Sequence, residues 1–169
     1  MKKITKVLCV VALLCCSTAV FAQGKFGHID LAALVELMPE RVEAQKSMQK
    51  LSVELEGELK NLQTEYQTKL AEYEKNVAVW SDLIKSTKED ELQAKMQQIQ
   101  SFSQNAQRSL QQEQMKLLNP IVKKAQDAVD AVAEGMKLEL VFDTSNQVLM
   151  YYSEKSVDLL PKVKEKLGL

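Results

Sequence analysis

The sequence predicts an α+β fold in which a small β body, shared between subunits, carries a long projecting antiparallel helical hairpin of the coiled-coil type. Three observations predict this fold. Residues 41–118 are poor in glycine and proline and rich in residues that favour helices. A turn-like break divides this stretch near its middle. The flanking chain holds only short β-prone runs, and so few strands are marginal within one chain.

The first 22 residues have the composition of a secretory signal peptide. Lysines precede an apolar run over residues 7–14, and small residues precede the expected cut after Ala22. A transmembrane anchor is not expected, because it needs about 20 apolar residues in succession. Lipidation at Cys15 or Cys16 stays open as an alternative. The sequence therefore predicts a mature chain that begins at residue 23 and is exported.

Charge and cysteine content narrow the function classes. All three cysteines lie in the expected signal peptide, so the mature chain has no disulfide and no cysteine metal site. The whole chain has 22 basic and 23 acidic residues; removing three lysines with the signal leaves 19 against 23, a mildly acidic balance. That balance argues against nucleic acid as a partner.

The expected hairpin arm covers residues 40–118, and its apolar residues recur with gaps of three and four that repeat every eleven residues. This spacing is close to the 3.6-residue period of a straight helix. It predicts one narrow stripe that covers a single partner helix. The stripe of the first helix comprises Met48, Leu51, Leu55, Leu59, Leu62, Tyr66, Leu70, Tyr73 and Val77.

A second helix follows the break at residues 78–82. Ser86 and Thr87, each followed three residues later by an acidic residue, are typical of a fresh helix start. The second stripe is less regular and comprises Leu92, Met96, Ile99, Phe102, Ala106, Leu110, Leu117, Leu118 and Ile121.

The remaining chain, residues 23–39 and 119–169, is expected to form the β-rich oligomerisation body. A strand over 25–30 precedes a short helix over 31–37, and Pro39 suits the first turn of the long helix. Asn119-Pro120 predicts a kink or a restart, and Gly135 a helix end. Two β-prone runs, 138–142 and 148–152, flank turn residues and predict a β-hairpin. Asp158 is placed to cap a last helix, with Pro161 in its first turn.

A sheet of two or three short strands leaves open edges, which copies of the chain could cover by pairing their strands. The residues expected at this contact are apolar and β-prone: Phe26, Ile29, Leu138, Leu140, Phe142, Val148 and Met150.

The start of the mature chain reads GKFGHID over residues 24–30, and its tail contains LVFD at 140–143 and VLMYY at 148–152. With the order of elements, these stretches resemble the Skp family of OmpH-like outer-membrane chaperones. The resemblance implies a periplasmic homotrimer with a β body, whose three arms enclose a cavity and hold unfolded outer-membrane proteins without ATP. Leu160-Pro161 departs from the family pattern. Because the chain is acidic, lipopolysaccharide binding is not carried over.

No constellation of catalytic residues is present, so we expect no enzyme and no cofactor. His28 is the only histidine, and a strand or surface role fits it better than a catalytic or metal role. Asp143-Thr144-Ser145 is similar to an aspartic-protease turn but lacks its glycine, so a plain turn is the better interpretation.

The expected hairpin tip carries Trp80, Leu83 and Ile84, which we predict to contact clients. Alternatively, Trp80 closes the turn by packing on the hairpin. The glutamine- and serine-rich second arm is either a polar lining that tolerates any client or an ordinary solvated helix. A second function class is an exported coiled-coil adaptor that docks onto an envelope complex, although such adaptors carry larger β domains.

Overall fold

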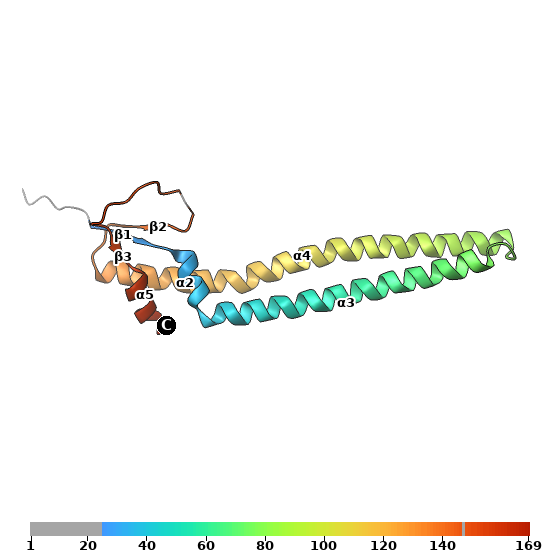
Figure 1. Cartoon of the computed structure of the whole chain (residues 1–169), viewed down its shortest axis with the longest axis horizontal. Helices are drawn as coiled ribbons and strands as arrows, with labels where there is room; N and C mark the ends of the chain where they lie inside the picture. Colours follow the sequence, from blue (N-terminus) through green and yellow to red (C-terminus); the bar gives the residue numbers. More distant parts are fainter. Residues whose placement is uncertain (1–24, 147) are drawn as a thin grey trace, which may run out of the picture.

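The computed structural model describes residues 25–146 and 148–169. A small body at one end carries a helical hairpin that extends far beyond it (Figure 1). The expected signal peptide, with Cys15 and Cys16, lies outside the described residues. In chain order the elements are β1 (Phe26–Ile29), α2 (Leu31–Leu37), α3 (Pro39–Asn76), α4 (Asp82–Gly135), β2 (Leu140–Asp143), β3 (Val157–Asp158) and α5 (Leu160–Leu167).

The hairpin is formed by α3 and α4, which lie side by side along its length (Figure 1). Pro39 occupies the first turn of α3, where its missing N–H costs nothing. The break falls between Asn76 and Asp82, as predicted. All nine residues of the α3 stripe are buried or partly buried, which confirms that this stripe is the face that α3 turns to α4.

The apolar stripe predicted for the second helix is wrong at one position. Met96 is 57% exposed, whereas the side chain of Lys95 is only 16% exposed. Lys95 places its ammonium group 2.7 Å from the Glu65 carboxylate across the hairpin. A long charged side chain can lay its methylenes along an apolar surface and keep its charge at the edge. Choosing the stripe by hydrophobicity alone therefore placed Met96 at a position that Lys95 occupies.

One expected helix start is also wrong, and of the two alternatives at Asn119-Pro120, a kink or a restart, the restart is excluded. Helix α4 begins at Asp82, not after Ser86 and Thr87, and it runs through Pro120 without a restart. Thr87 lies inside the helix and donates its hydroxyl to the Leu83 carbonyl one turn earlier, so it caps nothing. Pro120 is exposed, so water can meet the carbonyl that a proline leaves without its helical partner.

The sheet has the order β2-β1-β3, and both outer strands run parallel to β1. Parallel neighbours need a long crossover, and here the whole α2–α3–α4 unit connects β1 to β2. The predicted β-hairpin of 138–142 with 148–152 is therefore wrong. Because β2 and β3 lie on opposite sides of β1 and point the same way, residues 144–156 must carry the chain back across the sheet (Figure 1). We call the described residues of this stretch, 144–146 and 148–156, the return segment.

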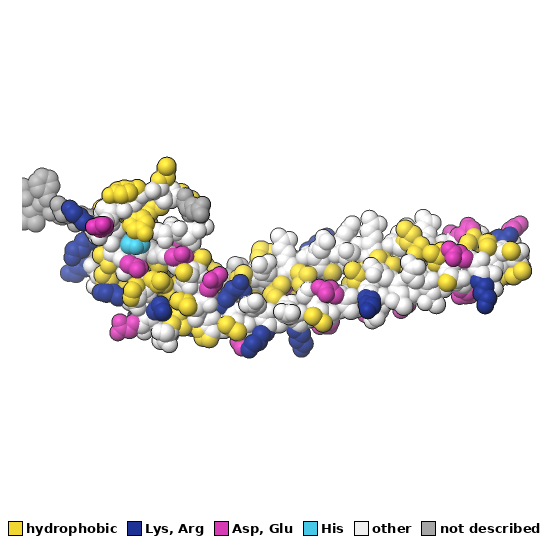
Figure 2. Space-filling model, in the orientation of Figure 1, with side chains coloured by type: hydrophobic (Ala, Val, Ile, Leu, Met, Phe, Trp, Pro, Cys, Tyr) yellow, Lys and Arg dark blue, Asp and Glu magenta, His cyan; other side chains and the backbone are white. Residues whose placement is uncertain are grey.

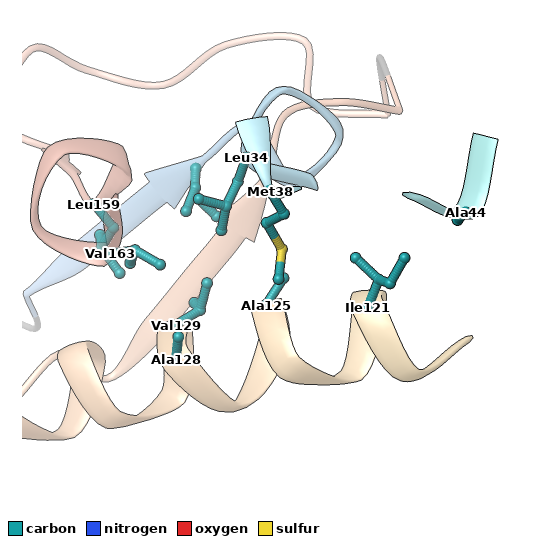
Figure 3. Packing of buried hydrophobic residues seen from close by; sticks show 10 residues of the cluster. Leu34, Met38, Ala44, Ile121, Ala125, Ala128, Val129, Leu159 and Val163 are labelled. Carbon is teal, nitrogen blue, oxygen red and sulfur yellow. The ribbon is translucent and has the colours of Figure 1, made fainter. Parts of the chain in front are cut away.

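One face of the sheet belongs to the hydrophobic core of the body. Leu34 and Met38 pack toward Ala125 of α4, with Leu159 and Val163 beside them (Figure 3). The larger of these side chains are at most 1% exposed. The core therefore joins α2, the C-terminal part of α4 and α5 within one chain.

Strand β1 packs closely against the core at Gly27, and α5 begins and ends at defined residues. A Cβ atom on Gly27 would lie 2.4 Å from Leu159 Cδ1 and 2.9 Å from Leu138 Cδ1, so β1 approaches them as only glycine allows. Leu159, not Asp158 as expected, occupies the N-cap position of α5, and Asp158 lies one residue earlier, where its Oδ1 accepts a hydrogen bond from the Leu160 amide at 2.9 Å. Gly168 ends α5 in the left-handed conformation, with φ of 72°.

The structure confirms the α+β class, with long helices and a small sheet. Within the described residues, no helix has both the length and the apolar character needed to cross a membrane.

Candidate functional site

The sheet face that points away from the core is largely apolar and only partly covered. Side chains alternate along a strand, so Gly27 and Ile29 meet the core while Phe26 and His28 point outward. The register places Phe26 beside Leu140 and His28 beside Phe142. The rings of Phe26 and Phe142 lie 6.4 Å apart. We call this surface, comprising Phe26, His28, Leu140 and Phe142, the outer sheet face.

The return segment arches over one side of the outer sheet face and leaves a cavity of about 860 Å³. Phe26, Phe142, Leu149 and Tyr152 are among the lining residues. His28 anchors the segment, because its Nδ1 lies 2.9 Å from Ser156 Oγ and its ring lies 4.3 Å from that of Tyr152. His28 therefore has two structural partners, both in the return segment.

Large apolar side chains of the return segment point into solvent. Val148 is 83% exposed, Met150 99% and Tyr151 81%. Figure 2 shows hydrophobic side chains gathered on this arch, beside the sheet. An exposed apolar patch of this kind on a small body usually marks an interaction surface.

The seven residues expected at the subunit contact fall into two groups. Five are exposed on the outer sheet face or the return segment: Phe26, Leu140, Phe142, Val148 and Met150. Ile29 is 3% exposed and belongs to the chain's own core, and Leu138 packs against that core. A contact role for any of them stays a prediction.

Asp143 has a structural role at the junction of β2 and α2. Its carboxylate accepts hydrogen bonds from the Ser145 amide and hydroxyl, both at 2.9 Å, and from the Leu31 amide at 3.3 Å. Burial raises the pKa of Asp143, but these hydrogen bonds outweigh it and hold the pKa below its usual value. Asp30 caps the same helix by accepting from the Ala33 amide at 2.9 Å.

At the hairpin tip, Trp80 is partly buried and its ring lies 6.0 Å from Tyr73 in an edge-on arrangement. The Tyr73 hydroxyl in turn donates to the Glu89 carboxylate on α4, and this hydrogen bond raises the pKa of Tyr73. Trp80 therefore helps to close the turn. Leu83 is 79% exposed and Ile84 is also exposed, so an apolar surface remains at the tip (Figure 2). Contact of the tip with clients stays a prediction.

Ion pairs tie the two arms together at both ends of the hairpin. Near the body, Lys124 of α4 pairs with Glu40 of α3. In the distal half, three pairs cross: Lys95–Glu65 at 2.7 Å, Lys69–Glu91 at 3.0 Å and Lys88–Glu72 at 3.8 Å. The hydrogen bonds from Lys95 and Lys69 lower the pKa values of Glu65 and Glu91. Exposed pairs of this kind align the arms more than they stabilise them.

Sequence reasoning missed two features of these surfaces. Tyr151 and Tyr152 add to the apolar arch, and their aromatic run was visible in the sequence. The return path over the sheet was not, because strand order depends on tertiary packing. Among the described residues, no group of three or more histidine, cysteine or acidic side chains is placed to hold a metal ion.

Comparison with known proteins matches this architecture to one family. The family model described as "Outer membrane protein (OmpH-like)" matches residues 25–167. The chaperone protein Skp of Pectobacterium atrosepticum is 24% identical over 164 residues, which cover 94% of this chain and 99% of that one.

A solved structure shares the fold. It is the crystal structure of an OmpH-like protein from Caulobacter crescentus described as a putative outer membrane chaperone. The two chains superpose with a TM-score of 0.73 at 14% identity, over 86% of this chain and 85% of the other. Since the family model spans nearly all the described residues, this chain belongs to the OmpH-like outer membrane protein family.

Proposed function

We propose that this chain is an ATP-independent holdase chaperone of the periplasm. In this proposal three copies assemble through their bodies, and the three hairpins enclose a cavity that holds unfolded outer-membrane proteins and prevents their aggregation. Membership of a family that includes a Skp chaperone supports the class of function.

The observation that carries the proposal is the shape of the hairpin. Helix α3 has 38 residues, which at about 1.5 Å per residue gives a rod of about 57 Å. Its apolar stripe is turned toward α4 and is mostly only partly buried, so the arm builds no globular core beyond the body. A long rod that projects from a small body suits the wall of a cavity.

The outer sheet face supports assembly through the body. Phe26 is 43% exposed and Leu140 55% exposed, although both lie on strands of the sheet. The outer edges of β2 and β3 are open in the single chain, and open edges are places where another strand can pair. We propose that a second and a third copy cover this face, with residues 23–39 and 119–169 as the oligomerisation body and 40–118 as the arm.

A turbidity assay tests the chaperone function. An unfolded membrane β-barrel protein is diluted from denaturant with and without the mature chain, which begins at residue 23, and no ATP is added. We expect light scattering to be suppressed at about one trimer per client. If the client aggregates unchanged, the holdase proposal is wrong.

The same protein can test the alternative function class, a structural adaptor. Capture of an envelope complex through the hairpin tip, with Leu83 and Ile84 needed for capture and no effect on aggregation, would favour the adaptor. Secretion is tested separately by the mass of the exported chain, which should begin at Gln23.

A further inference from the structure

A cleft lined by residues of both α3 and α4 lies in the half of the hairpin nearest the body. Its volume is about 670 Å³. The ion pairs that cross the hairpin lie at Glu40 and from Glu65 outward, and no ion pair between described residues crosses at residues 41–64. The arms are therefore tied on both sides of the cleft but not within it.

The cleft has two glutamine rows and an apolar floor. Gln45 and Gln49 line it on α3, and Gln107, Gln111 and Gln114 line it on α4. Met48 and Leu110, one from the apolar stripe of each helix, also line the cleft and are partly buried, whereas the five glutamines are exposed. Glu56 is the one charged residue among the described residues of the lining, and its carboxylate accepts a hydrogen bond from the Ser52 hydroxyl at 2.9 Å.

The glutamine amides are available for a ligand. Each carries two N–H donors and one carbonyl acceptor. None of the side-chain hydrogen bonds between described residues uses one of these five amides, whereas in the distal half of the hairpin Lys69 pairs with Glu91 and Lys95 with Glu65. A site whose rows are uncharged and offer both donors and acceptors suits an uncharged ligand of the same amide chemistry.

The spacing of the rows fits an extended polypeptide backbone. Residues four apart on a helix are separated by about 6 Å along its axis. In an extended chain, amide groups on one side recur every two residues, or about 6.6 Å. On α3 the lining of the cleft runs from Gln45 through Gln49 to Glu56, about 16 Å, which matches about five extended residues.

An extended segment in the cleft would contact the two rows with its backbone and the floor with its side chains. Backbone N–H and C=O groups point sideways from an extended chain, toward the rows, while alternate side chains point down to the floor or up to solvent. Every polypeptide has the same backbone, so this site would accept any sequence that leaves its backbone unpaired. A folded protein, whose backbone groups are already paired, would not fit.

We infer that this cleft binds one extended segment of an unfolded client through the client's backbone amides. The inference rests on the proposed chaperone function and names its site. Three arms would supply three such sites, so weak single contacts would add through avidity. Release would follow when the client's own strands pair and withdraw their amides.

Glutamine-to-methionine substitution tests the inference, because methionine keeps the length and helix propensity of glutamine but loses its hydrogen bonds. The cleft variant carries Gln49→Met and Gln111→Met. The matched control carries Gln63→Met and Gln112→Met, two exposed glutamines outside the cleft. Circular dichroism checks that the helical content of both variants is unchanged.

The readout is the affinity for a fluorescently labelled, urea-unfolded membrane β-barrel protein, measured by anisotropy. We expect the cleft variant to bind about three- to tenfold more weakly, and the control to bind within about twofold of the unmodified chain. Equal or tighter binding by the cleft variant would overturn the inference, since an apolar cleft gains from methionine. If the unmodified chain binds no client, the proposed function itself is wrong.

A photo-crosslinking residue identifies the occupant. Placed at position 111 it should crosslink to the client, and placed at 112 it should do so far less. A crosslink from position 111 to another copy of this chain, in the presence of client, would show that the cleft holds a neighbouring arm and would contradict the inference.

Discussion

Replacing Gly27 with alanine should destabilise the body, because β1 has no room for a Cβ atom on its core side. The new carbon would lie 2.4 Å from Leu159 Cδ1 and 3.4 Å from the Val157 carbonyl oxygen. Leu159 is fully buried, so its side chain has little space to move away. Overpacking of this kind typically costs about 1–3 kcal/mol.

Replacing a glycine of the arm with alanine should stabilise the protein instead. Gly57 lies within α3, and a Cβ atom there would meet nothing within 4 Å. Alanine favours the helix over glycine by about 0.5–1 kcal/mol at such a position. Gly57→Ala is therefore the matched control for Gly27→Ala.

Amide hydrogen exchange read by mass spectrometry can separate the two effects, since it reports on the body and the arm independently. Both variants are compared with the unmodified chain at one protein concentration, because assembly would make stability depend on concentration. We expect faster exchange in β1 and α5 for Gly27→Ala, and slower exchange in α3 for Gly57→Ala. Unchanged or slower exchange in β1 for Gly27→Ala would refute the close packing of β1 on Leu159.

Three further predictions concern the core, the sheet junction and the arm. Leu34→Ala should cost about 2–5 kcal/mol in denaturant unfolding, because Leu34 is fully buried, whereas exposed Leu83→Ala should cost almost nothing; similar costs would contradict this core. The pKa of Asp143 is lower in the folded chain than its unfolded value of about 3.8, so ionised Asp143 stabilises the fold above that pH. This stability is lost as pH falls through the folded pKa. The free energy of unfolding of Asp143→Asn should therefore depend less on pH below about 4 than that of the unmodified chain. If both proteins lose the same stability as the pH falls, ionised Asp143 does not stabilise the fold. Lys95→Gln, which breaks the pair with Glu65, should lower the unfolding midpoint in low salt and have less effect in 1 M salt; an effect independent of salt would exclude an electrostatic cause.

The hairpin could be predicted from the sequence because its signals are local. The eleven-residue spacing fixes one face of α3, and every residue of that stripe from Met48 to Val77 faces α4 at least in part. Pro39 and the break before Asp82 mark its ends through backbone chemistry alone. Lys95 escaped prediction because its burial depends on Glu65 across the hairpin.

The body was harder to predict because its strands are placed by distant partners. Residues 148–152 have the composition of a strand, yet they form part of the return segment, since β1 is already flanked by β2 and β3. β3 is two residues long and has no periodicity to detect. The glutamines of the cleft were visible in the sequence, but only their position around a cleft that both helices line distinguishes them from ordinary surface residues.

The most direct test of the chaperone proposal is the mass of the assembly, measured by light scattering coupled to size-exclusion chromatography. The mature chain alone should have three times the mass of one copy. After addition of an unfolded membrane β-barrel protein, the mass should rise by that of one client. A stable single copy that forms no complex with the client would contradict the proposal.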